Sequence, residues 1–160
     1  AKFYWPLVRA AESSPSYLHR FFLHWLITRK SAGTEHEVLV ENFTKNPAAW
    51  ETFARGLDRF AAVSREHGVC GHVLIHPHFE QFDASHPYLP IYERVRKAAI
   101  ERGLTVTQPF QYMVGHAPKR AKALWVNLFD PHPNRRGHEL LAEALHDDLR
   151  ALPAECWKLE

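Results

Sequence analysis

A short apolar run, from Val69 to Ile75, most constrains the fold of this chain. It follows a helix-patterned segment that Gly68 ends, and it stops at the breaker pair His76-Pro77. An apolar run of this length between two breakers is typical of a buried strand in a parallel sheet, because both faces of such a strand are covered. The sequence therefore predicts a fold in which helices pack around this strand.

Helices are predicted on both sides of the strand from the spacing of apolar residues and from capping signals. Two of them begin where a capping residue precedes a proline, at Ser14 and at Asn46. Glycines are expected to end the first and third helices, at Gly33 and Gly103. The predicted helices cover residues 15–33, 47–67, 87–102 and 135–152.

Further strand candidates alternate with these helices. Leu104 to Thr107 is the second, Trp125 to Phe129 is a weaker third, and Val38 to Val40 is either a strand or an ordered loop. The alternation predicts an α/β fold with a parallel sheet covered on both faces. Sheets of this type have about five strands. We therefore expect the sheet to be incomplete at its N-terminal side, with its first strands upstream of this chain.

Length and composition set outer limits on the class of protein. With 160 residues, 46% hydrophobic and 24% charged, the chain suits one globular domain over residues 1–160. A net charge of +2 gives no basic field for nucleic acid, and no apolar run approaches the roughly 18 residues of a membrane span. Cys70 and Cys156 lie far apart, so we expect no disulfide scaffold, and Cys70 is expected to be inert on a buried strand. The chain begins with Ala1, so the sequence leaves the compartment open.

Ligands of open parallel sheets bind beyond the carboxyl ends of the strands, where three loops are expected, at residues 76–78, 108–110 and 130–134. The last loop is the most informative. Asp130 can accept the Nδ1 proton of His132 and leave Nε2 free as a base, while the two flanking prolines restrict the backbone. The alternative is a capped helix entry with a surface Asp and His.

The segment from Asp130 to His138, with the leucine-rich helix after it, resembles the last conserved block of the SGNH (GDSL-type) hydrolases. The order of the preceding helices and strands is similar as well. The resemblance implies a three-layer α/β/α sandwich with a flavodoxin-like parallel sheet, and it implies ester hydrolysis without a metal or another cofactor. A serine would attack the acyl carbon, His132 would be the general base, and Asp130 would orient it. A Gly and an Asn on other loops would stabilise the oxyanion.

The chain departs from the family pattern in two places. It contains neither a Gly-Asp-Ser nor a Gly-x-Asn-Asp motif, and Pro131 alone separates Asp130 from His132, where the family usually has two residues. We therefore expect the chain to be the C-terminal part of a larger hydrolase, inactive by itself as a serine esterase. The expected substrate is a small acyl ester or an acetylated carbohydrate. An open sheet edge also predicts a dimer or a complementing N-terminal half.

Two other functions stay open at this point. His76 and His78 could join Asp130 and His132 as ligands of a metal-dependent hydrolase, with His138 beside them. The chain could also be a non-catalytic module that binds a carbohydrate or a protein through its aromatic side chains. In the hydrolase interpretation, His76 and His78 line the substrate pocket and His138 supports the Asp130–Asn134 loop.

Overall fold

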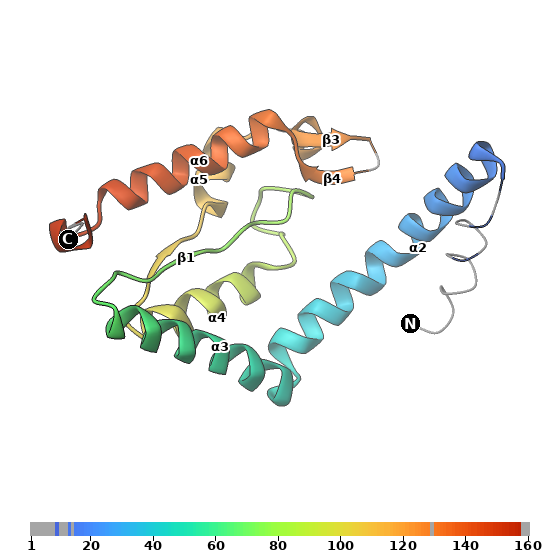
Figure 1. Ribbon diagram of the computed structural model, residues 1–160. Coiled ribbons are helices and arrows are strands. Elements are labelled where there is room, and N and C mark those ends of the chain that lie inside the picture. The colour runs from blue at the N-terminus through green and yellow to red at the C-terminus, as the bar shows by residue number, and fades with distance from the viewer. Residues whose placement is uncertain (1–8, 10–12, 14, 129, 158–160) are drawn as a thin grey trace. The chain divides into compact units, whose positions relative to one another are not determined.

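The computed structural model describes residues 9, 13, 15–128 and 130–157 (Figure 1). The chain divides into two compact units, Ala1–Lys45 and Asn46–Glu160. Each unit is described by itself. That both belong to one domain stays a prediction.

The first unit holds one long helix, α2, over Tyr17–Thr44. Its N-cap is Ser16, whose side chain accepts the backbone N–H of His19 at 3.4 Å; the predicted cap, Ser14, lies outside the described residues. The prediction that Gly33 ends this helix is wrong, as is the strand or loop at residues 38–40. A glycine ends a helix when it takes up a positive φ, and among the described glycines only Gly68 and Gly103 do so.

The second unit holds the remaining helices. Three of them confirm the predicted positions: α3 over Pro47–Glu66, α4 over Leu89–Ile100 and α6 over Arg135–Arg150. The local chemistry explains their limits, because Asn46 accepts the N–H of Ala49 at 3.2 Å and both α3 and α4 are followed by a glycine with positive φ. The sequence had not predicted α5, over Phe110–His116, or the 3-10 helices η1 and η2, over Ala121–Leu124 and Ala154–Trp157.

Strands of the second unit form two small sheets. β1 over His72–Leu74 pairs in parallel with β2 over Thr105–Thr107, as predicted. β3 over Trp125–Asn127 pairs antiparallel with β4 over Asp130–Pro133. The expectation of a third parallel strand here is wrong, because two residues separate β3 from β4 and a parallel connection needs about a dozen. The chain is thus mixed α/β, and its described residues show two-stranded sheets without a three-layer sandwich.

The core of the second unit includes two apolar clusters of described residues. One joins α3 and α4 to the parallel strands, and Figure 1 shows β1 running above these helices, with α6 on its other side. Its buried members are Leu57, Ala61, Ala98, Ala99 and Leu104. The other cluster lies between α5, α6 and η1, and its buried members are Phe79, Met113, Leu124, Leu140 and Leu141. The run from Val69 to Ile75 is less buried than predicted, since Val69 is 59% exposed and Leu74 39%.

A disulfide joins Cys70 to Cys156, with the two Cα atoms 5.3 Å apart. This corrects the expectation of unpaired cysteines and of an inert Cys70 on a buried strand, because Cys70 precedes β1 at an exposed position. The two cysteines are 86 residues apart, so the sequence alone does not indicate that they pair. Among the described helices, none combines the length and the apolar character that crossing a membrane requires.

Candidate functional site

Asp130 and His132 form a directly hydrogen-bonded pair on β4. The Asp130 Oδ1 atom lies 2.5 Å from Nδ1 of His132, and it also accepts the backbone N–H of His132 at 3.0 Å. The single intervening proline therefore does not keep the two side chains apart. One carboxylate oxygen thus contacts both the ring and the backbone of the histidine, which orients the ring within three consecutive residues of β4.

The charge on Asp130 is favoured by this arrangement. Hydrogen bonds from the backbone N–H of His132, and then from its ring, lower the pKa of Asp130 below its usual value. An ionised carboxylate accepts the Nδ1 proton of the neutral ring and leaves the Nε2 lone pair free. The side chain of His132 is 82% exposed and that of Asp130 is 40% exposed. The free nitrogen is thus accessible to a reacting group.

Asn134 ties the start of α6 to the hairpin that carries the pair. Its Oδ1 accepts the N–H of Gly137 at 3.1 Å, which makes it the helix cap that the sequence predicts. Its Nδ2 also donates to the carbonyls of Ala123 and Trp125, at 3.0 and 3.1 Å. These additional bonds were not predicted. They connect η1, β3 and α6 around one side chain.

The start of α6 also packs closely against the segment that follows β1. A Cβ atom added at Gly137 would lie 2.9 Å from the Phe79 ring and 2.8 Å from Pro133. Trp125 strengthens the same junction, because its Nε1–H donates to the Phe79 carbonyl at 2.5 Å. A half-buried tryptophan needs a partner for its N–H, but the sequence gives no sign that this partner lies 46 residues away.

The two histidines expected to line the substrate pocket lie directly after β1. Burial lowers the pKa of His76 most, and the charges of His78, His138 and His132 lower it further, against a backbone hydrogen bond that raises it. His76 is therefore close enough to the Asp130–His132 pair for their charges to interact. The ring of His78 stacks on Tyr88, with the ring centres 4.3 Å apart.

The second expected loop, at residues 108–110, is not an open loop. Phe110 begins α5 and is 1% exposed. Gln108 is half-buried, and its Oε1 atom has no hydrogen-bond partner within the described part of the chain. The structure thus brings two of the three predicted loops together around histidine side chains and uses the third to start a helix.

The described residues offer no metal site for this pair, and the serines of the second unit hydrogen-bond to groups other than His132. No three His, Cys, Asp or Glu side chains among them are placed to hold a metal ion, so the metal-dependent alternative lacks a ligand set there. The second unit contains two serines. Ser64 donates to the Phe60 carbonyl and Ser85 to Asp83.

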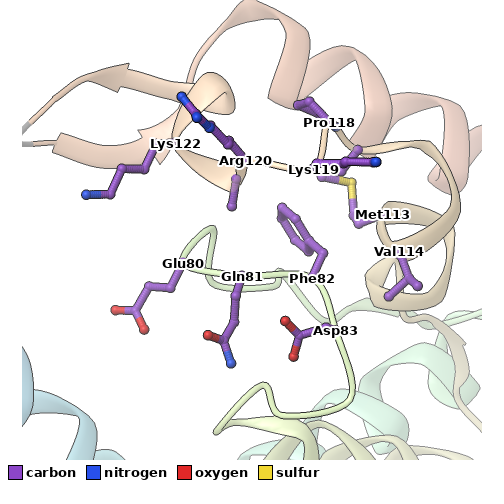
Figure 2. A pocket seen from close by; sticks show the side chains of 12 residues that line it. Glu80, Gln81, Phe82, Asp83, Met113, Val114, Pro118, Lys119, Arg120 and Lys122 are labelled. Carbon is purple, nitrogen blue, oxygen red and sulfur yellow. The ribbon is translucent and has the colours of Figure 1, made fainter.

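A pocket of about 330 Å³ lies in the second unit between residues 80–83 and 113–122 (Figure 2). None of the predicted site residues lines it. The residues that do were not singled out from the sequence, because neither segment carries a recognisable motif.

Comparisons with known proteins identify no relative. No family model matches the chain, no curated protein matches it, and no solved structure matches it.

Proposed function

We propose that this chain is the C-terminal portion of an SGNH-type ester hydrolase and supplies the base of a Ser-His-Asp triad. His132 is the general base, Asp130 orients it, and the serine comes from outside these 160 residues. The observation that carries the proposal is the 2.5 Å contact between Asp130 Oδ1 and His132 Nδ1. The resemblance of the Asp130–His138 segment to the family block agrees with it.

The proposed reaction follows from the orientation of the imidazole. Nε2 of His132 removes the proton of the serine hydroxyl as the serine oxygen attacks the acyl carbon. The imidazolium then gives that proton to the leaving alcohol, and water repeats the sequence to release the acid and the serine. Asp130 stays ionised throughout and stabilises the imidazolium, as its lowered pKa favours.

The three-layer sandwich belongs to the same proposal. Both α4 and α6 contact β2, which agrees with helices on the two faces of a sheet. β1 pairs with β2 along one edge. In the complete enzyme, further parallel strands would extend this sheet from the other edge of β1.

The proposed substrate is a small acyl ester or an acetylated carbohydrate, with His76 beside the reacting group. His76 is an exposed side chain whose lowered pKa favours a neutral ring near pH 7. A neutral imidazole can both donate and accept a hydrogen bond. That chemistry suits a sugar hydroxyl or an ester oxygen.

The tautomer of His132 tests the pair in the chain as it stands. Long-range ¹H–¹⁵N spectra are expected to show the neutral ring protonated at Nδ1, and Asp130→Asn is expected to remove this preference. His146 is the matched control, since its ring is 65% exposed and lies 3.6 Å from Asp147; its spectrum should not respond to Asp130→Asn. A His132 ring protonated at Nε2 would contradict the proposed role of Asp130.

Hydrolysis tests the function itself. In the protein that includes the nucleophile segment, His132→Gln is expected to lower kcat for p-nitrophenyl acetate by about 10³-fold or more, because triad members act as a unit. His146→Gln should leave kcat unchanged. Undiminished hydrolysis by the His132 variant would overturn the proposal.

A further inference from the structure

The pocket in Figure 2 has both apolar and charged walls. Its lining includes the apolar side chains of Phe82, Met113, Val114, Ala117, Pro118 and Ala121. A volume of about 330 Å³ is at the small end of the range in which proteins bind small molecules. The pocket therefore has the size and the apolar surface for a compact ligand.

Three cationic side chains line one wall of this pocket. Lys119, Arg120 and Lys122 lie on one short segment, opposite Glu80 and Asp83 (Figure 2). Among the described residues, no ion pair joins any of the three cations to a carboxylate. Lys122 lies over the Trp125 ring, with its Nζ atom 5.2 Å from the ring centre, so Lys119 and Arg120 contribute most of the charge that a ligand would meet.

The opposite wall neutralises this charge only in part. Asp83 accepts the backbone N–H and the hydroxyl of Ser85, at 2.8 and 2.5 Å, so its carboxylate is already hydrogen-bonded within its own turn. Glu80 is the other carboxylate that lines the pocket. Three cations against two carboxylates leave the pocket with a net positive charge, which favours an anion.

We propose that this pocket binds a small amphiphilic anion, with a carboxylate or phosphate head on a short apolar tail. Arg120 would bind the head through charge-assisted hydrogen bonds, and the lysines on either side, whose charged ends point to opposite sides in Figure 2, would add positive charge around it. Phe82 and Val114 would cover the tail, and burial of apolar surface favours a tail over a bare ion. The proposal does not involve His132 and is independent of the proposed hydrolase.

Ligand titration by ¹H–¹⁵N NMR tests the proposal, with hexanoate and hexyl phosphate as probes for the two head groups. Saturable shifts are expected at the amides of residues 80–83 and 113–122. Hexan-1-ol, which lacks the charge, and acetate, which lacks the tail, are each expected to bind at least about tenfold more weakly, because hydrogen bonds to a charged group and burial of the tail both contribute to affinity.

Paired variants separate the contributions of charge and cavity. The double variant Arg120→Gln/Lys122→Gln is expected to weaken hexanoate binding about tenfold or more, whereas Lys97→Gln, at an exposed position on α4, should have no effect. Val114→Phe fills the pocket and should weaken binding to a similar extent. Val126→Phe is its matched control, since Val126 is also exposed but does not line the pocket.

Three results would overturn the proposal. One is the absence of saturable shifts at the pocket with either anionic probe. The second is equal affinity for hexanoate and hexan-1-ol, which would show that the cations contribute nothing. The third is tighter binding of hexylammonium than of hexanoate, which would show that Glu80 and Asp83 determine the preferred charge.

Discussion

At the scale of single residues, the packing at the start of α6 depends on a residue without a side chain. Gly137 leaves no room for a Cβ atom between Phe79 and Pro133. The glycine thus lets the start of α6 approach the segment after β1. Sequence inspection shows a glycine in the family-like block but not what it packs against.

Gly137→Ala is therefore expected to destabilise the protein by about 1–2 kcal/mol, because the cost of overpacking exceeds the gain in helix propensity. Gly56→Ala is the matched control, because nothing lies within 4 Å of the added Cβ on α3. That variant should gain up to about 1 kcal/mol. Urea unfolding measures both, and equal effects of the two substitutions would contradict the packing argument.

Two histidines with lowered pKa values, His72 and His76, make stability depend on pH. Burial lowers the pKa of His72, against the raising charge of Asp148, and burial also lowers the pKa of His76. The unfolded chain binds protons at these two histidines more readily than the folded chain does. Their contribution to the free energy of unfolding is therefore fully present above pH 6.5, the usual histidine pKa, and is lost as the pH falls through the lowered pKa values of the folded state. Lowered carboxylate pKa values, such as that of Asp130, add a second loss at more acidic pH.

Urea unfolding at pH 7.5 and pH 5.5 measures the first of these losses. His72→Gln is expected to reduce the difference between the two free energies of unfolding. His146→Gln, at an exposed position, should not change it. A difference that is the same in the wild type and in the His72 variant would disprove the contribution of His72.

At the scale of elements, capping residues predicted where α3 and α6 begin. The sequence did not predict how β3 and β4 pair. Asn46 and Asn134 accept the N–H groups that their positions before α3 and α6 predict. These signals are local, so the sequence carries them in full. The β3–β4 hairpin forms because the chain turns back after β3 and pairs with the next segment. The length of α2 depends on Gly33, which remains helical. Neither is encoded within a few neighbouring residues.

The two functions of Asn134 can be separated by substitution. Asn134→Ala removes the cap and both Nδ2 hydrogen bonds, and it is expected to cost about 2 kcal/mol. Asn134→Asp keeps an oxygen for Gly137 but loses the donors to Ala123 and Trp125, so it should cost about half as much. If the two variants are equally stable by urea unfolding, the cap on Gly137 contributes nothing, and if Asn134→Asp is as stable as the wild type, the Nδ2 bonds contribute nothing.

At the scale of the whole molecule, the disulfide connects the two sequence ends of the parallel-sheet region. Cys70 precedes β1 and Cys156 lies in η2, after α6. The chain-entropy model assigns about 4–5 kcal/mol to closing a loop of this length. The link was not predictable, because two distant cysteines in a sequence carry no sign of being neighbours in space.

Cys70→Ser/Cys156→Ser is expected to lower the free energy of unfolding by up to that amount. The wild type under reducing conditions should unfold at the same urea concentration as the variant. Thiol titration of the unfolded, unreduced wild type should detect no free cysteine. Two titratable thiols, or an unchanged stability in the double variant, would contradict the bridge.

The α/β class of the fold was predictable from the sequence, but the number and arrangement of its strands were not. The parallel pairing of β1 with β2 followed from two short apolar runs, each after a helix and a glycine. The Asp130–His132 pair followed from the local sequence, although its place on a hairpin did not. The pocket of Figure 2 depends on side chains from two separate segments and could be found only in three dimensions.

The hydrogen bonds within Asp130–His132 have a consequence for how such a site can change. Because one carboxylate oxygen contacts both the ring and the main chain of a residue two positions on, the internal geometry of the pair needs no support from distant parts of the protein. The tripeptide is therefore expected to keep these two hydrogen bonds when it is placed in another hairpin. In the proposed hydrolase, the base and the nucleophile would then come from two segments of chain that can change independently.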